Sequence, residues 1–387
     1  MISLGAATAH RGPTAARRTC LLAFLAVLYL LPASAADPAP IRFAVIGDSG
    51  TGGQHQHRIA QQMLSWRERM PYDLVLMLGD NIYGGPLGWG GGSRQDFEEK
   101  FDRPYAELLA RGVIFRAALG NHDMRNNDGQ DLIQDYDRFH IEGPQGYYSF
   151  TAGSWQPAEG EPAPLLEFFV INTIRLEKEK RDAEQLAWLA AALDRSRARW
   201  RILYGHHPLY STGRKHGGDP KLREKLEPIL LGSSASAASS AVATATQSSA
   251  GRVPEADASG AGGEKEAGAR VQVVFAGHDH IYQRFHPQNG VAYFVCGSSG
   301  QLRRGNAEPS PLVAAVEDQQ RAFMLWEATP AELRYWAINE QGEAFDCGRL
   351  LADGTHEPVA CPAAVHPEAG GAGPLSTETL DSGANLE

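Results

Sequence analysis

The sequence contains few cysteines and no apolar run long enough to cross a membrane. Four cysteines occur among 387 residues, and no two of them have the close spacing of a structural zinc site. The apolar run nearest the N-terminus covers residues 21–31, well short of the roughly 20 residues that a bilayer span requires. These absences argue against a cysteine-ligated zinc fold and against a transmembrane anchor.

Positive charge is also scarce. The chain has 36 Lys and Arg against 46 Asp and Glu, a formal net charge of −10. Such a surface repels nucleic acid and anionic lipid, so we expect neither as a partner. An anionic substrate would need a local positive charge to approach this surface, and bound metal ions would supply it.

The N-terminus has the pattern of an export signal. Arg17 and Arg18 precede the apolar run, and small residues follow it at positions 33–35. We therefore predict a signal peptide over residues 1–35 and an exported protein, periplasmic or secreted, without a stable membrane anchor. The paired arginines also resemble a twin-arginine signal, so the choice between the Sec and twin-arginine routes stays open.

Removal of this signal would leave three cysteines, an odd number that cannot form a closed disulfide framework. Cys347 and Cys361 flank one short segment and can pair in an oxidising compartment, a pairing that the sequence leaves open. Cys296 ends an apolar run, and we expect a buried free thiol there.

Apolar, β-branched runs alternate with amphipathic stretches, which predicts an α/β fold with buried strands. The expected strands are 41–46, 74–78, 113–119, 166–171, 201–204 and 271–276, and the expected helices are 59–69, 94–111 and 182–197. Three later runs, 291–295, 322–326 and 333–338, occur without helices and predict antiparallel strands of a second sheet. The segment 233–269 is rich in Ser, Ala, Gly and Thr and is expected to be a disordered insertion in one domain over 36–350, followed by a mostly disordered extension over 351–387.

Five expected strands end in a glycine followed at once by a side chain that can bind a metal. The pairs are Gly47-Asp48, Gly79-Asp80, Gly120-Asn121, Gly205-His206 and Gly277-His278. The carboxyl ends of parallel strands lie along one rim of a sheet, and glycine there allows a sharp turn and a close approach. Taken singly, such an aspartate is most often a turn or cap residue and such a histidine a core residue. Together the five predict ligands aimed into one crevice.

Two further residues fit the same chemistry. His278 and His280 alternate across one residue, so both rings can reach neighbouring metals. Tyr83 follows Asp80 by three positions, a spacing that can bring its phenol back to the same ion. A lone tyrosine would instead be a core aromatic.

These motifs resemble the five metal motifs of the purple acid phosphatases in order and placement. They are Gly-Asp-Ser-Gly from 47, Gly-Asp-Asn-Ile-Tyr from 79, Gly-Asn-His-Asp from 120, Gly-His-His-Pro from 205 and Gly-His-Asp-His from 277. The resemblance runs from about residue 41 to 338 and is greatest to the small single-domain members, the tartrate-resistant acid phosphatases of the calcineurin-like metallophosphoesterase superfamily. It implies a four-layer α/β fold in which two mixed β-sheets pack as a sandwich flanked by helices.

The resemblance assigns ligands to two metal ions. Asp48, Tyr83 and His280 would hold Fe(III), since a carboxylate and a phenolate are hard anionic ligands. Asn121, His206 and His278 would hold Fe(II), Zn or Mn, with Asp80 as the bridge. Most relatives in the superfamily carry Asp-x-His in the first motif, whereas Asp48 is followed here by Ser49 and Gly50. Tyr83 would fill the vacancy, as in the purple enzymes.

The resemblance also implies two catalytic histidines. His122 would donate a proton to the leaving alkoxide, and His216, one residue later than the family spacing, would assist substrate binding. We expect His207 to be structural or to support a metal ligand from outside the metal shell, and His55 and His57 to be solvent-exposed at the start of a helix. Arg125, Arg214 and Lys215 are expected to be solvated surface charges rather than phosphate ligands.

The implied activity is that of an exported, monomeric acid phosphatase. It would hydrolyse small phosphomonoesters by direct attack of a metal-bound hydroxide. One alternative is a phosphodiesterase or nucleotidase with the same two-metal site. The other is a non-catalytic exported protein that binds metal or phosphate, which a missing ligand or acid would signal, and none is missing.

Overall fold

The computed structural model describes residues 39–84, 93–125, 130–177, 182–232 and 269–362. The expected signal peptide, all but the last residue of the insertion, and residues 363–387 of the extension lie outside this part. Among the described segments, no helix combines the length and the apolarity of a membrane span.

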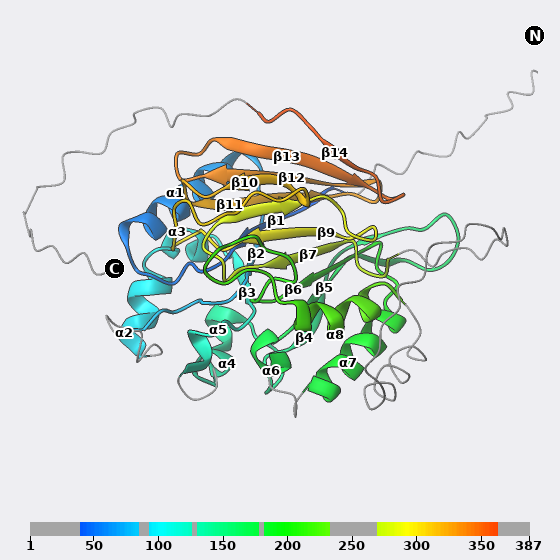
Figure 1. Ribbon diagram of the computed structural model, residues 1–387, viewed down its shortest axis with the longest axis horizontal. Coiled ribbons are helices and arrows are strands. Elements are labelled where there is room, and N and C mark those ends of the chain that lie inside the picture. Colours follow the sequence, from blue (N-terminus) through cyan, green and yellow to red (C-terminus); the bar gives the residue numbers. More distant parts are fainter. Residues whose placement is uncertain (1–38, 85–92, 126–129, 178–181, 233–268, 363–387) are drawn as a thin grey trace, which may run out of the picture. The chain divides into compact units, whose positions relative to one another are not determined.

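Two mixed seven-stranded sheets form the centre of the fold (Figure 1). The first has the order β14-β13-β12-β11-β1-β2-β3, and its strands are β1 (Ile41–Ile46), β2 (Leu74–Met77), β3 (Ile114–Ala117), β11 (Ala322–Ala328), β12 (Glu332–Asn339), β13 (Ala344–Leu351) and β14 (His356–Pro358). The strands β1, β2 and β3 are parallel, and β11 pairs antiparallel with β1.

The second sheet has the order β10-β8-β9-β7-β6-β5-β4. Its strands are β4 (Tyr148–Trp155), β5 (Ala163–Val170), β6 (Trp200–Tyr204), β7 (Val273–Ala276), β8 (Tyr282–Phe285), β9 (Ala292–Cys296) and β10 (Val313–Glu317). The strands β5, β6, β7 and β9 run parallel. The expected α/β architecture of two mixed sheets is confirmed.

The prediction that the last three runs share one second sheet is wrong, although β11 and β12 pair antiparallel as expected. The strand β9 pairs in parallel with β7 in the second sheet, whereas β11 and β12 extend the first sheet next to β1. All five residues of β9 are buried, and a run buried on both faces carries no alternation that could specify its neighbours. Spatial order therefore departs from chain order in both sheets.

Aromatic side chains fill the space between the two sheets. Phe43 of β1 meets Phe168 of β5 with ring centres 5.2 Å apart, and Trp326 of β11 lies 5.1 Å from Phe275 and 5.2 Å from Phe294. Edge-to-face contacts at these distances add to the stabilisation from area burial. This aromatic layer holds the sheets together.

Helices pack against the sheets. The helix α1 (Gln54–Arg69) buries Ile59, Met63 and Trp66 against the core of the first sheet. The helices α7 (Asp182–Arg195) and α8 (Pro220–Leu230) cover the outer face of the second sheet (Figure 1). Shorter helical turns include α4 (Gln130–Gln134), α5 (Tyr136–Phe139), α6 (Thr173–Glu177) and a 3-10 turn over Asp123–Arg125.

The single helix expected over 94–111 is broken into pieces. It consists of α2 (Arg94–Phe97), a π-helical turn (Glu98–Asp102) and α3 (Ala106–Ala110). Pro104 lies between the last two pieces, where its missing N–H and its ring oppose a continuous helix.

A disulfide closes the edge of the first sheet. Cys347 of β13 is bonded to Cys361, with Cα atoms 5.4 Å apart, while Cys296 is buried and free. The strand β14 pairs with β13, so the sheet continues beyond residue 350, where the sequence placed the end of the domain.

We expect loss of this disulfide to lower stability. A bridge across 14 positions removes loop entropy from the unfolded chain, so the Cys347→Ala/Cys361→Ala variant should lose about 2–3 kcal/mol of unfolding free energy. Urea denaturation measures this loss. Reductant should reproduce it in the wild-type protein, because the third described cysteine is unpaired, and identical curves with and without reductant would contradict the expectation.

Candidate metal centre

The five glycine-ligand pairs lie at the carboxyl ends of parallel strands from two sheets. Those containing Asp48, Asp80 and Asn121 follow β1, β2 and β3 of the first sheet, and those containing His206 and His278 follow β6 and β7 of the second. The sheets meet at this rim, where the backbone N–H of His278 donates to Asp48 Oδ2 at 2.8 Å. The crevice is thus shared by two sheets, whereas the pattern of strand ends predicted the rim of one sheet.

The glycines permit this convergence. A Cβ atom at Gly277 would lie 2.5 Å from Asp48 Oδ2, and one at Gly120 would lie 2.1 Å from the backbone nitrogen of Asp80. The next residues carry strain of their own, because Asp48, Asp80 and His278 have φ angles of 53°, 52° and 69°. Left-handed backbone in residues other than glycine is uncommon and concentrates at functional sites.

Asp48, Tyr83 and His280 form a first donor cluster. The Tyr83 hydroxyl lies 3.1 Å from Asp48 Oδ1 and 3.3 Å from His280 Nε2, and the latter two atoms are 3.4 Å apart. Donors that bind one ion at about 2.1 Å lie about 3.0–3.4 Å from one another in octahedral or tetrahedral geometry. The three atoms therefore fit a single metal ion.

Asn121, His206 and His278 form a second donor cluster. His206 Nε2 lies 3.1 Å from Asn121 Oδ1 and 3.2 Å from His278 Nδ1. Its other nitrogen, Nδ1, lies 3.0 Å from the carbonyl oxygen of Leu78. Donation of Nδ1–H to that carbonyl fixes the tautomer and leaves the Nε2 lone pair for a metal.

Asp80 lies beside both clusters. Its Oδ1 lies 3.5 Å from His206 Nε2 of the second cluster, and donor atoms of Asp48, Asp80 and His206 all lie within 4.8 Å of one another. Burial and the negative charges of Asp48 and Asp123 hold the pKa of Asp80 well above its usual range. Two fully buried carboxylates side by side require a shared proton or positive charge between them, and bound metal ions would provide that charge.

The second-cluster histidines are neutral. Burial lowers the pKa of His206 and of His278 to about 3. Metal ligation requires the unprotonated imidazole, so both rings are ready to bind. All seven residues predicted as ligands are brought together, and their donor chemistry fits two metal ions.

The two predicted catalytic histidines lie beside the clusters. The His122 ring centre is 4.5 Å from that of Tyr83, and its Nε2 is 3.9 Å from Asp80 Oδ2. The His216 ring centre lies 4.2 Å from that of His278. Both imidazoles therefore border the space that a substrate bound at the clusters would occupy.

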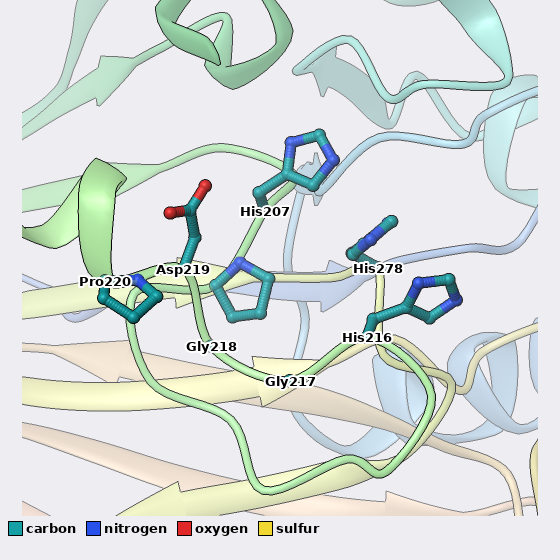
Figure 2. Close-up of a pocket in the computed structure, with 8 residues that line it drawn as sticks. His207, His216, Gly217, Gly218, Asp219, Pro220 and His278 are labelled. Carbon is teal, nitrogen blue, oxygen red and sulfur yellow. The ribbon is translucent and has the colours of Figure 1, made fainter.

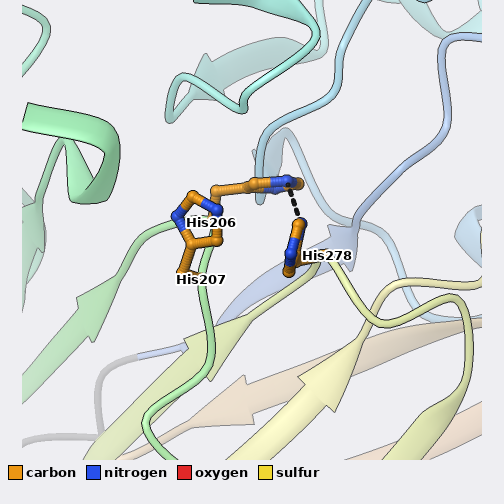
Figure 3. Close-up of side chains that lie close together, drawn as sticks. All are labelled: His206, His207 and His278. Carbon is orange, nitrogen blue, oxygen red and sulfur yellow. Dashed lines mark hydrogen bonds between the residues drawn. The ribbon is translucent and has the colours of Figure 1, made fainter. Parts of the chain in front are cut away.

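His207 lies directly beside the second cluster. Its Nδ1 lies 2.9 Å from Thr173 Oγ1, and its ring centre is 4.3 Å from that of His278. His206, His207 and His278 have nitrogen atoms within 4.8 Å of one another (Figure 3). His207 is thus an alternative donor beside the second cluster.

Two buried aspartates support the site, and the sequence analysis gave them no role. Asp123 accepts hydrogen bonds from the backbone N–H groups of Gly120 at 2.8 Å and Asn81 at 2.9 Å, which ties the second motif to the third. Asp279 accepts hydrogen bonds from the Ser211 hydroxyl and from Gly217 N–H at 3.1 Å. It thereby links the loop that carries His216 to the segment between His278 and His280. In the sequence, these supporting roles were indicated only by the position of each aspartate inside a metal-ligand motif.

The other polar residues considered from sequence lie apart from the two donor clusters. Arg214 and Lys215 are exposed, and Arg214 pairs with Glu308 at 3.6 Å. The expected exposure of His55 and His57 in the first turn of α1 is only partial, because His55 Nδ1 contacts Glu340 at 2.7 Å. The side chain of Arg125 lies outside the described part.

A cavity of about 230 Å³ adjoins the second cluster. His207, His216 and His278 line one part of it, and Asp219 and Pro220, at the start of α8, line another (Figure 2). This cavity reaches His278 of the second cluster and offers space for part of a ligand.

Comparisons with known proteins agree with this geometry. Residues 41–282 match the calcineurin-like phosphoesterase family. Purple acid phosphatase 17 of Arabidopsis thaliana is 26% identical over 295 residues, 70% of this chain and 71% of that protein. Tartrate-resistant acid phosphatase type 5 of Mus musculus is 22% identical over 346 residues, 82% of this chain and 92% of that protein.

A solved structure shares the fold. GAP50, described as the anchor in the inner membrane complex of Plasmodium, matches with a TM-score of 0.59 at 17% identity, over 81% of this chain and 89% of that one. At this identity the likeness speaks for the fold and not for a shared activity.

Proposed function

Because the chain belongs to the calcineurin-like phosphoesterase family, we propose that it is an acid phosphatase that hydrolyses phosphomonoesters at a centre for two metal ions. Family membership supports phosphoester hydrolysis at a dimetal site. The observation that carries the proposal is the pair of donor clusters, with the buried carboxylate of Asp80 close to His206 of one and to Asp48 of the other. The acid phosphatases among the sequence relatives favour a monoester as the substrate.

The donor sets suggest which ions would bind. The first cluster, with a carboxylate and a phenolate, suits Fe(III), and the second, with two imidazoles and an amide oxygen, suits Fe(II), Zn or Mn. Two such ions would supply positive charge for the phosphoryl oxygens and would acidify a bound water. Asp80 would hold the two sites at a fixed separation.

The chain's own residues would orient the ester and deliver a proton. The ring of His216, next to His278, would contact the phosphoryl group. An imidazole N–H of His122 would donate its proton to the ester oxygen as the bond to phosphorus breaks. The buried carboxylate of Asp123 accepts a hydrogen bond from the N–H of Gly120, just before Asn121 and His122. This hydrogen bond would hold the backbone of those two residues in position.

Export would fit the same function. The disulfide between Cys347 and Cys361 supports an oxidising compartment, since such bonds persist mainly in exported proteins. We therefore propose that residues 1–35 act as a cleaved signal and that the protein works in the periplasm or outside the cell.

Two other functions can be separated by experiment. A phosphodiesterase or nucleotidase would use the same donors, and relative rates on p-nitrophenyl phosphate and bis(p-nitrophenyl) phosphate distinguish it. A non-catalytic role is the second, because GAP50 has this fold and is described as an anchor. The metal-loaded protein should hydrolyse the monoester faster than the diester, and inactivity on both would favour the non-catalytic role.

We expect His122→Ala to impair esters with poor leaving groups most. A general acid contributes roughly 10²- to 10⁴-fold, so kcat for an alkyl phosphate such as glycerol 2-phosphate should fall by about that factor. The fall for p-nitrophenyl phosphate should be smaller than about tenfold, because nitrophenolate leaves without protonation. Steady-state kinetics with both substrates measures the difference, and equal losses would assign His122 another role.

We expect the iron-loaded protein to show a tyrosinate-to-iron charge-transfer band in the visible spectrum. Tyr83→Phe removes the phenolate from the first cluster and should abolish the band. Metal analysis of each sample serves as the control for occupancy. Two bound metals without this band in the wild-type protein would contradict the assignment of Fe(III) to the first cluster.

A further inference from the structure

The cavity beside the second cluster is suited to the alcohol part of a phosphate ester. His278, a donor of the second cluster, lies at one side of it, and Asp219 lies at the other, as Figure 2 shows. Its volume of about 230 Å³ is below the roughly 300–1,000 Å³ of pockets for drug-sized ligands. A group of a few heavy atoms therefore fits beside a phosphoryl group bound at the metal donors.

The wall opposite His278 has its backbone donors already engaged. Gly217 N–H binds Asp279, Gly218 N–H binds the Ser211 carbonyl at 3.1 Å, and Asp219 N–H binds the Pro208 carbonyl at 2.9 Å. Pro220 has no N–H, and the next two residues of α8, Lys221 and Leu222, donate to Asp219 Oδ1 at 2.9 and 3.0 Å. The N-terminus of a helix usually attracts anions through its free N–H groups, but at α8 the side chain of Asp219 already binds these groups.

The same wall presents an acceptor. Asp219 uses Oδ1 for the cap, and its Oδ2 has no hydrogen bond or ion pair within the described ranges. The carboxylate is half-buried, and the neighbouring cations Lys215 and Lys221 are exposed to solvent, where their charges are screened. A ligand group here meets a negative acceptor and no backbone donor.

We propose that the cavity selects phosphomonoesters of small amino alcohols, with the ammonium group of the substrate donating to Asp219. The inference rests on the proposed function, since it assumes that the phosphoryl group occupies the two donor clusters. In the reaction a water oxygen would replace the alcohol oxygen on phosphorus. The alcohol would leave with a proton, and its ammonium group would be unchanged.

Three substrates of similar size test this selectivity. They are O-phosphoethanolamine, neutral propyl phosphate and anionic phosphoglycolate. We expect kcat/KM of the metal-loaded protein to be about two- to fivefold higher for O-phosphoethanolamine than for propyl phosphate, the size of a partly exposed ion pair, and lowest for phosphoglycolate. Equal values for the first two substrates would overturn the inference.

Asp219→Asn isolates the charge. Asparagine caps helices as well as aspartate does, so α8 should keep its start while the preference for O-phosphoethanolamine over propyl phosphate falls to about one. Asp219→Ser, another uncharged cap, should behave alike, and thermal unfolding checks that both variants fold. A preference that persists in both folded variants would refute the role of Asp219.

Asp353→Asn is the matched control. Asp353 is exposed, lies in the turn between β13 and β14, and accepts the Thr355 N–H through Oδ1 at 2.9 Å, so the same change there should leave the preference intact. Hydrolysis of p-nitrophenyl phosphate separates the two proposals. Activity on it without selectivity contradicts this inference alone, whereas inactivity on every phosphate contradicts the proposed function as well.

Discussion

The burial of Asp48 and Asp80 at the junction of two sheets is the constraint on which the site depends. Both carboxylates are almost fully shielded from solvent, and such a pair is stable only with positive charge or proton between the oxygens. Two of the neighbouring imidazoles do not supply that charge, because burial lowers the pKa of His206 and of His278 to about 3. Two local features serve the same end, which is to aim anionic ligands at bound cations. Neighbouring glycines leave room for the two carboxylates, and Asp48 and Asp80 themselves adopt left-handed backbone.

Much of this arrangement could be predicted from local patterns. The strands β1, β2, β6 and β7 and the polar residue after each were visible as apolar runs ending in glycine and a ligand, and the structure brings all seven proposed ligands together. Their assignment to ions remains a prediction. The pairing of β9 with β7 could not be predicted, because a fully buried run carries no register signal. The supporting roles of Asp123 and Asp279 could not be predicted either, because each role depends on a hydrogen bond from a backbone N–H that is distant in the sequence.

The rim combines rigid and adjustable parts. The donors at strand ends are fixed by the aromatic layer between the sheets, including Phe43 and Trp326. The walls of the adjoining cavity come instead from the loop that carries His216 and from the start of α8, held by Asp279 and Asp219. The proposed metal donors, whose distances must stay fixed, therefore follow strands. The residues proposed to select the substrate lie on a loop and a helix start, where sequence can change without disturbing those donors.

The most direct test of the two-ion centre is a crystal structure of the metal-loaded protein with anomalous diffraction at the absorption edge of each metal found. The account predicts two peaks roughly 3.5–4 Å apart, one among Asp48, Tyr83 and His280 and one among Asn121, His206 and His278. A single peak, or an ion held by His206, His207 and His278 without Asn121, would contradict it.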